Sequence, residues 1–426
     1  MGSTSDLEAR FPDLNRVSMP NRVVMPGLIN AHTHTVLNVL RGTIENGEGD
    51  RVYGFMVPIT FAMSNEDRQA IAALGCLEAI QSGTTTIVDP LRFVPSYAQA
   101  MVESGLRLYL AESAADAVTT EIRTKGYRYE RSWGEAFLQR TIELIDTHHN
   151  THNGRVQCMV AAHATDNCSS WILDELRDIA EDRKLLRTVH LAQSRQEVEQ
   201  VQSMTQGRTP AEYLLDHGWL GRDVLVAHCT HCTSSDIGLL AETDTSMAHC
   251  PASSSRRGFH GLADMPGLVD AGVNVTLGTD NMSEDMFDAM RIGIIVNRGL
   301  RRDTTRPTSP EMLAWATRNA ALALQREDLG TLEPGKKADL AVVRTDRAHL
   351  TPLLDVISNL VHYGQASDVE SVMVDGEWIM KDGKVLTMDE AAVTEAAQEA
   401  ALHGWRNLHQ ESPDIGMVPE FEDLLI

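Results

Sequence analysis

Residues 23–35 read VVMPGLINAHTHT, and the rest of the chain can be interpreted outward from this stretch. An apolar run ends at Pro26 and Gly27, and a second short apolar run leads to His32 and His34. Residues two apart on a strand point to the same face, so both imidazoles are expected to converge. Two convergent imidazoles at a strand end are a good start to a metal site. A bare His-x-His pair is more often two exposed histidines in a turn, so the metal interpretation depends on later strand ends.

Later in the chain, short β-type runs alternate with helical patterns from Val23 to about Leu324. This alternation predicts repeated βα units and a parallel sheet. The eight candidate strands end, in chain order, at His34, Asp89, Glu112, His163, His190, His228, His249 and Asp280. Polar residues therefore recur at the C-terminal ends of the strands, which is where a (β/α)8 barrel carries its chemistry.

The motif PGLINAHTH and these strand ends resemble the amidohydrolase superfamily. The best match is its branch of cytosine deaminase-like, S-adenosylhomocysteine deaminase-like and triazine hydrolase-like enzymes. The resemblance covers roughly Val23 to Leu386. It implies an α/β fold, a (β/α)8 TIM barrel with a small accessory β-domain and a C-terminal helix. It also implies one divalent metal per chain, Zn²⁺ ahead of Fe²⁺.

Four segments are expected along the chain. They are a short leader that joins the accessory β-domain (1–24), the barrel (25–328), the accessory β-domain (329–386), and a C-terminal helix with a tail (387–426). Relatives usually carry several strands before the first His-x-His. We therefore expect either that the accessory domain is reduced at the N-terminus, or that the N-terminus was cut or mis-started. Asp375-Gly376 predicts a hairpin turn, and Thr387 with Glu390 predicts a capping box for the last helix.

Composition excludes several classes of protein. The 426-residue chain has a formal charge of −23, which disfavours binding to nucleic-acid phosphates. No stretch is apolar and long enough to span a bilayer, and the polar N-terminus does not resemble a signal peptide. Six cysteines in a chain of this size do not indicate a disulfide framework, so a reduced, cytoplasmic setting is expected. The expected partner is a small-molecule substrate, and by analogy with relatives the chain is a homo-oligomer.

The resemblance assigns the metal to His32, His34, His190 and Asp280, with His228 an occasional additional ligand. A lone histidine at a strand end is more often bound to backbone, and a lone aspartate there is often a helix N-cap. Matching strand ends favour the metal interpretation. Three histidines and a carboxylate suit Zn²⁺ or Fe²⁺, which lowers the pKa of a bound water to roughly 7. By resemblance, Asp280 takes the proton of the attacking water and His228 polarises that water. Asp89, at the second strand end, is expected to be buried and hydrogen-bonded.

Substrate contacts are expected from His163, His249, Gln193 and Tyr53. A core histidine explains His163 nearly as well, and the position of His249 is more often structural or substrate-facing than catalytic. Tyr53 lies in RVYGFMVPI (51–59), where relatives often show a tryptophan-leucine pair. SSSRRG (253–258) likewise replaces an asparagine-bearing loop. Both segments lie where substrate should bind, so the substrate is expected to be unusual.

One family residue is missing. The fifth strand continues as His190-Leu191-Ala192-Gln193, whereas the family has glutamate three residues after the histidine. That glutamate moves a proton between water and substrate, and its loss typically costs ~10²–10⁴ in rate. Three explanations compete: an inactivated variant that traps substrate, a reaction that needs no such shuttle or recruits Glu112 or Glu197, and a metal-binding pseudoenzyme. The second is slightly favoured.

The sequence therefore predicts a metal-dependent hydrolase of non-peptide C–N bonds, a cyclic amidine aminohydrolase. By resemblance, a metal-bound hydroxide attacks an sp² carbon of a nitrogen heterocycle or amidine-like group and releases ammonia, an amine or a halide. In this scheme Asp280, His228 and Gln193 are the catalytic residues. Two alternatives are use of the same metal barrel for a non-hydrolytic elimination or cyclisation, and a catalytically inactive substrate-binding protein.

Overall fold

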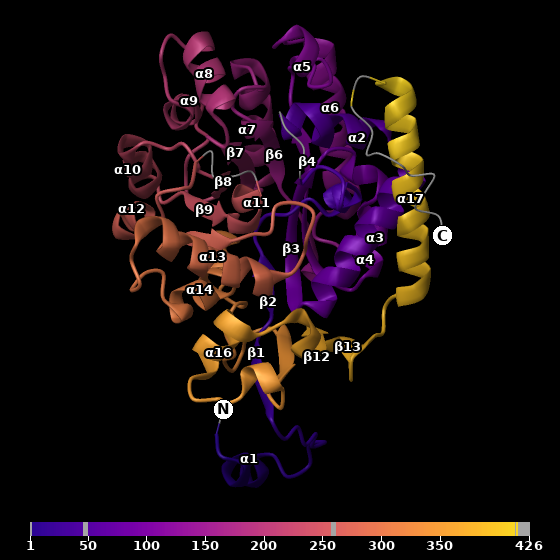
Figure 1. The fold of residues 1–426 in the computed structure, drawn as a ribbon, viewed down its shortest axis with the longest axis vertical. Coiled ribbons are helices and arrows are strands. Elements are labelled where there is room, and N and C mark those ends of the chain that lie inside the picture. The colour runs from indigo at the N-terminus through magenta and orange to yellow at the C-terminus, as the bar shows by residue number, and fades with distance from the viewer. Residues whose placement is uncertain (1, 46–49, 257–260, 414, 416–426) are drawn as a thin grey trace.

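The protein is described by a computed structural model that covers residues 2–45, 50–256, 261–413 and 415. Its centre is a parallel sheet curled into a barrel, with helices outside it (Figure 1). The eight barrel strands, in their spatial order, are β2 (Leu28–Asn30), β3 (Thr84–Leu91), β4 (Arg107–Ala114), β6 (Val160–Ala164), β7 (Arg187–Leu191), β8 (Val224–His228), β9 (Ser246–His249) and β10 (Val275–Leu277). A short strand, β5 (Val156–Cys158), also pairs with β4. The predicted (β/α)8 barrel is confirmed.

The barrel closes between its first and last strands. Ala31 N donates to Leu277 O at 3.0 Å, Asp280 N donates to His32 O at 3.0 Å, and Thr33 forms a parallel bridge with Asp280. Strands β2 and β10 are only three residues long. His32, His34 and Asp280 therefore lie in the segments just beyond these strands, and not on the strands as the period-two argument assumed. These residues converge because the Thr33–Asp280 bridge closes the barrel, and not because they alternate along a pleated strand.

Two motif glycines permit the close approach of these segments. A Cβ atom on Gly27 would lie 2.2 Å from the Thr85 side chain, and one on Gly278 would lie 2.6 Å from the carbonyl oxygen of His32. Contacts this short cannot be relieved without moving backbone or a neighbouring strand. The PG motif therefore lets the chain before β2 approach β3, and the LGTD motif (277–280) lets the segment before Asp280 approach the one that carries His32.

Helices follow most of the strands and cover the outside of the barrel. They are α2 (Val57–Ala62), α3 (Asn65–Gln81), α4 (Ala98–Glu103), α5 (Ile122–Lys125), α6 (Arg131–His148), α7 (Ser170–Arg183), α8 (Arg195–Met204), α9 (Pro210–Asp216), α10 (Ser234–Glu242), α11 (Pro251–Arg256), α12 (Met265–Asp270), α13 (Met286–Arg301), α14 (Ser309–Trp315) and α15 (Arg318–Ala323). α3 begins with a reciprocal capping box between Ser64 and Asp67. Short helices η1 (Thr35–Leu40) and η2 (Val52–Met56) precede α2.

A second, antiparallel sheet forms the accessory part. Its order is β1 (Arg22–Pro26), β11 (Leu340–Arg344), β12 (Val369–Val374), β13 (Glu377–Lys381) and β14 (Lys384–Val385). The turn at Asp375-Gly376 joins β12 to β13, as predicted. Strand β1 runs across the boundary expected between residues 24 and 25, since it pairs with β11 over its whole length. Helix α16 (Val356–Tyr363) packs against α13 and α14, and α1 (Thr4–Arg10) buries no residue.

The last helix, α17 (Glu390–Glu411), packs along α3 and α2 (Figure 1). The capping box expected from Thr387 and Glu390 is wrong. The N-cap is Asp389, which accepts from the amides of Ala391 and Ala392, while Thr387 donates to the carbonyl of Ser104. Asp389 lies directly before the helix, and its short side chain reaches both amides. It therefore caps the helix in place of the predicted Thr387–Glu390 box. Most of the tail after Gln410 lies outside the described residues.

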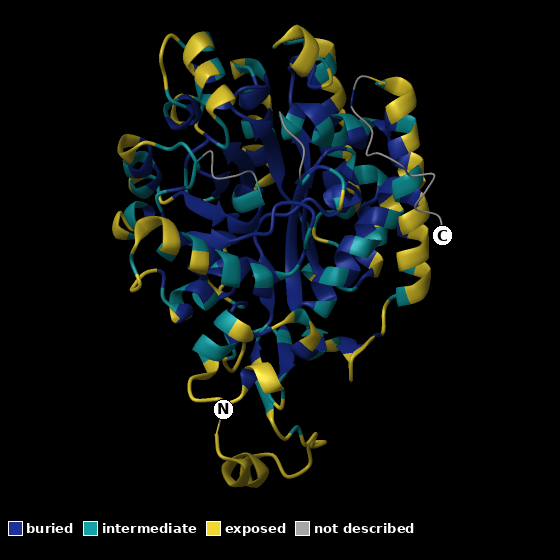
Figure 2. Cartoon of the chain, in the orientation of Figure 1, coloured by how far each residue is buried: buried dark blue, intermediate teal, exposed yellow. Residues whose placement is uncertain are grey.

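Burial is concentrated in the barrel strands, and the exposed residues lie on the outer helices, on α1 and over the accessory part (Figure 2). None of the six cysteines, which all lie within the described residues, forms a disulfide bond. Over the part of the chain that the structure describes, no helix has both the length and the apolar character needed to cross a membrane.

Candidate metal centre

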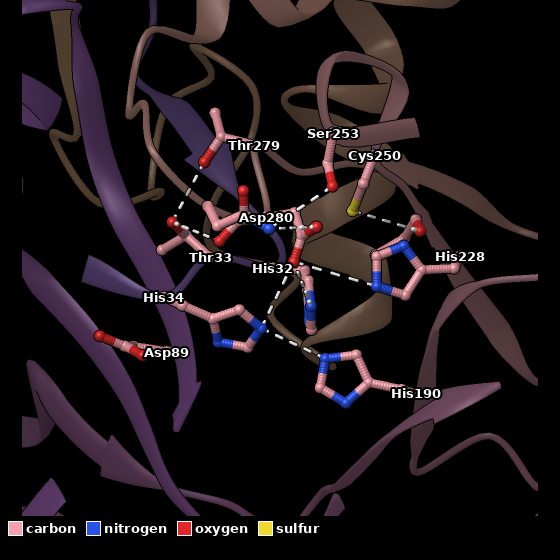
Figure 3. Close-up of polar contacts among 12 residues, drawn as sticks. His32, Thr33, His34, Asp89, His190, His228, Cys250, Ser253, Thr279 and Asp280 are labelled. Carbon is pink, nitrogen blue, oxygen red and sulfur yellow. Dashed lines mark hydrogen bonds and ion pairs between the residues drawn. The ribbon is translucent and has the colours of Figure 1, made fainter. Parts of the chain in front are cut away.

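Four buried side chains meet at the C-terminal mouth of the barrel (Figure 3). One potential ligand atom from each of His32, His34, His190 and Asp280 lies within 4.8 Å of the others. Asp280 Oδ1 is 3.6 Å from His32 Nε2 and 3.4 Å from His34 Nε2, and His34 Nε2 is 3.2 Å from His190 Nε2. Ligand atoms about 2 Å from a tetrahedral ion are separated by similar distances. The four residues thus have the spacing of a metal site.

Hydrogen bonding fixes the state of one of these imidazoles. His190 Nδ1 contacts the carbonyl oxygen of His163. A carbonyl only accepts, so Nδ1 carries the proton and Nε2 presents a lone pair to the cluster. Burial, followed by the nearby His32, lowers the pKa of His190 to about 3, and the same two causes lower the pKa of His34 well below its usual value. Neutral imidazoles are the form that binds metal.

Asp280 is the anionic member of the cluster. Burial alone would raise its pKa, but the imidazoles of His228, His32 and His34 outweigh burial and hold the pKa well below its usual range. His228 Nε2 lies 3.9 Å from Asp280 Oδ1, and the His228 ring stacks on that of His190 with centroids 5.4 Å apart. His228 therefore borders the cluster beside Asp280, His190 and His32.

The donor set fits a divalent metal. Both ring nitrogens of His32 and Nδ1 of His34 are buried, and the described residues offer them no hydrogen-bond partner. Buried polar atoms are rarely left without a partner, and an ion between these atoms would satisfy the Nε2 positions. Three imidazoles and one carboxylate are suited to Zn²⁺.

A buried network, missed by the sequence analysis, holds the ligand segments in place. Glu284 is fully buried, and its Oε2 accepts from Thr33 Oγ1 at 2.8 Å and Asn30 Nδ2 at 3.1 Å. Asn30 Nδ2 also donates to Thr279 Oγ1 at 2.7 Å. Thr279 Oγ1 also donates to Thr33 Oγ1 at 3.1 Å (Figure 3). Thr33 lies between the two histidines and Thr279 precedes Asp280, so the Glu284 carboxyl group links both halves of the cluster. The only sequence signal was the asparagine of the PGLIN motif.

Backbone strain also concentrates at the site. His228 has φ of 76° and Asp280 has φ of 70°, and neither residue is glycine. Such conformations cost of order 1–3 kcal/mol each and persist where the surrounding structure enforces them. The two residues that border the expected water position are therefore held in sparsely populated backbone conformations.

A small pocket opens beside the cluster. Its described lining residues are His34, Leu37, Val52, Met56, Val57, Leu91, Arg92, His163, His190, Gln193, Asp280 and Asn281. The pocket thus brings together two of the metal-site histidines, Asp280, and two of the predicted substrate contacts, His163 and Gln193.

Comparison with known proteins identifies the family. Residues 23–379 match the Amidohydrolase family. The chain is 33% identical over 399 residues to a 5-methylthioadenosine/S-adenosylhomocysteine deaminase of Moorella thermoacetica, covering 91% of this chain and 89% of that protein. It is 32% identical over 385 residues to a 5'-deoxyadenosine deaminase of Methanothermobacter thermautotrophicus, covering 89% and 87%. This chain belongs to the amidohydrolase family.

A solved structure supports the same assignment. The crystal structure of an adenosine deaminase from Xanthomonas campestris with bound zinc matches this amidohydrolase with a TM-score of 0.84 and 25% identity, covering 94% of this chain and 90% of that one. The resemblance predicted from the PGLINAHTH motif is confirmed.

His163 is held in one orientation by neighbours of the pocket. Asn167 Nδ2 contacts His163 Nδ1 and also donates to Tyr53 Oη at 2.9 Å. An amide nitrogen only donates, so His163 Nδ1 accepts and Nε2 carries the proton. Tyr53 in turn donates to Asp166 Oδ2 at 2.7 Å. In this amidohydrolase the Tyr53 hydroxyl is therefore occupied by Asp166 and Asn167, and it acts on the pocket through His163.

His249 lies away from the pocket. Its Nε2 accepts from Asn297 Nδ2 at 3.1 Å, and its ring meets the edge of Trp315 with centroids 6.3 Å apart. It is not among the described lining residues. We therefore leave His249 out of the proposed substrate contacts. Its two partners come from α13 and α14, distant in sequence, which is why the strand-end pattern did not separate it from the other histidines.

The two acids named as substitutes for the missing glutamate are both engaged elsewhere. Glu197 accepts from Thr165 Oγ1 and from the backbone amides of Ala192 and Gln193, so it holds the Gln193 segment in place. Glu112 accepts from Arg140 Nε at 2.6 Å and from Val94 N at 2.9 Å. Among the described lining residues of the pocket, Asp280 is the only acid.

Proposed function

We propose that this amidohydrolase is a zinc-dependent aminohydrolase that converts an amino-substituted nitrogen heterocycle and water into the oxo heterocycle and ammonia. The observation that carries the proposal is the meeting of His32, His34, His190 and Asp280 at a pocket that also presents His163 and Gln193. The names of the sequence relatives, which are deaminases of adenine nucleosides, make aminopurines the first substrates to test.

In this proposal the three histidines and Asp280 hold one zinc ion. When bound, zinc supplies a water of lowered pKa, roughly 7, and polarises the electrophile. His228, beside Asp280, orients the attacking water. The Nε2–H of His163 and the amide of Gln193 orient the heterocycle so that its amino-bearing carbon faces that water.

Asp280 carries the proton steps. It accepts a proton from the attacking water and returns it to the departing amine, because no other described residue of the pocket lining is acidic. Gln193 donates a hydrogen bond to the ring and cannot transfer a proton. In this scheme Asp280 alone carries out the proton transfers that in the family also involve the glutamate.

The test is ammonia release from zinc-loaded protein with 5'-deoxyadenosine, 5'-methylthioadenosine, S-adenosylhomocysteine, and aminopyrimidine, pterin and triazine compounds. We expect turnover with the native chain, and a change of at most about tenfold in Gln193→Glu, less than the ~10²–10⁴ of a required shuttle. Turnover by Gln193→Glu alone would contradict the single-carboxylate scheme. Stoichiometric zinc without ammonia from either form would overturn the proposed function.

The remaining sequence-based expectations are kept as part of this proposal. They are the division into segments 1–24, 25–328, 329–386 and 387–426, a homo-oligomeric state and a cytoplasmic setting. Sedimentation of the zinc-loaded chain tests the oligomeric state directly. A mass near 46.9 kDa, that of one chain, would exclude a homo-oligomer.

A further inference from the structure

Arg92 is a buried cation that the proposed mechanism does not use. It follows strand β3 directly and lines the pocket, with only 2% of its surface exposed. Its Nε and Nη2 have no hydrogen-bond partner among the described residues. Burial lowers the pKa of Arg92 to about 10, so the side chain is still charged at neutral pH. A buried guanidinium without a partner destabilises the folded protein, so its presence indicates a role in the site.

Arg107 shows the pairing that Arg92 lacks, because its Nε and Nη2 atoms have a carboxylate partner. Arg107 Nε and Nη2 bind the two carboxylate oxygens of Asp339 at 2.8 and 3.0 Å. This two-pronged arrangement is the strongest contact that a guanidinium makes. Glu112, the carboxylate that acts on Arg92 electrostatically, is already bound to Arg140 and to the amide of Val94. The Nε and Nη2 atoms of Arg92 are therefore available to donate hydrogen bonds to two acceptor atoms of a ligand.

The position of Arg92 limits where those acceptors lie on the ligand. Arg92 is close enough to His34, His163 and His190 to affect each of them electrostatically. A heterocycle whose reacting carbon faces the metal ligands would bring its own ring edge to Arg92. A charge on a long substituent would lie further out.

We propose that Arg92 selects a heterocycle carrying an anionic group, a carboxylate or an oxyanion with a neighbouring acceptor, directly on its ring. This inference rests on the proposed function for the presence of a heterocycle in the pocket, but it concerns binding and can be measured without turnover. Among the heterocycles that the pocket admits, Arg92 then favours those with a ring anion over neutral ones.

The test compares binding of uracil and orotate, which differ by one ring carboxylate, to zinc-loaded native chain and Arg92→Met by calorimetry. We expect the native chain to prefer orotate by about 30-fold or more, and Arg92→Met to lose that preference. Because the variant removes an unpaired buried charge, its melting temperature should rise. Arg155→Met is the control: Arg155 donates to the carbonyls of Leu106 and Val102, so this variant should melt lower and keep the preference.

Other outcomes overturn the inference. A preference that survives Arg92→Met would place the carboxylate on the metal. Equal binding of the two pyrimidines by the native chain, or a lower melting temperature of Arg92→Met with unchanged preference, would make Arg92 a structural residue. An Arg92-dependent preference for S-adenosylhomocysteine over 5'-methylthioadenosine, with none for orotate, would move the charge from ring to substituent. If no compound releases ammonia while the orotate preference holds, the proposed function fails and the role of Arg92 stands.

Discussion

At the scale of single residues, position in the chain did not determine role, since His190, one residue before the end of β7, and His249, at the end of β9, are both buried. One faces the metal cluster and the other accepts from Asn297. The sequence could predict the ligand residues because several strand ends coincided. It could not predict partners such as Asn297 or Glu284, since these come from helices and loops distant in sequence.

This pair gives a matched test. His190→Ala should reduce bound zinc well below one per chain and abolish ammonia release, because it removes a proposed ligand and the lone pair that the His163 contact fixes. His249→Ala should keep stoichiometric zinc and most activity but lose stability, by about 1–3 kcal/mol for the broken contact. Metal analysis and thermal melting measure both. Equal zinc loss in the two variants would contradict the assignment.

At the scale of elements, the strands were predictable and their ends were not. The apolar runs predicted the order of the barrel strands. However, β2 and β10 are only three residues long, and beyond them the chain pairs through the Thr33–Asp280 bridge. The helix cap near Thr387 failed for a similar reason: Thr387 is drawn to the carbonyl of Ser104 by a tertiary contact. Local patterns cannot show such competition.

Helix α17 contacts the segment that follows His34. Trp405 is buried, and its Nε1 donates to the carbonyl of Val39 in η1 at 3.0 Å. Trp405→Ala should lower stability by about 3–5 kcal/mol, as expected for a large buried side chain. The exposed neighbour gives the control, and Arg406→Ala should stay within about 0.5 kcal/mol. Similar denaturation midpoints for the two variants would show that α17 does not support η1.

At the scale of the whole molecule, buried acids should make stability depend on pH. Asp89 is fully buried and accepts from Thr35, and burial raises its pKa from 3.8 to about 7. The folded state therefore keeps a proton that the unfolded chain loses. The contribution of Asp89 is fully present below about pH 4 and is lost as the pH rises through 7. Asp89→Asn should flatten this fall in the unfolding free energy, measured by denaturation at several pH values; an unchanged slope would contradict the assigned pKa.

The most direct test of the account is a zinc titration of the metal-free chain, followed by ammonia release from the best substrate of the panel. We predict that the rate rises in proportion to added zinc and levels off at one ion per chain, and that His190→Ala shows no such rise. A rate independent of zinc, or full zinc binding with no ammonia released at any ratio, would contradict the claim that this barrel is a zinc-dependent aminohydrolase.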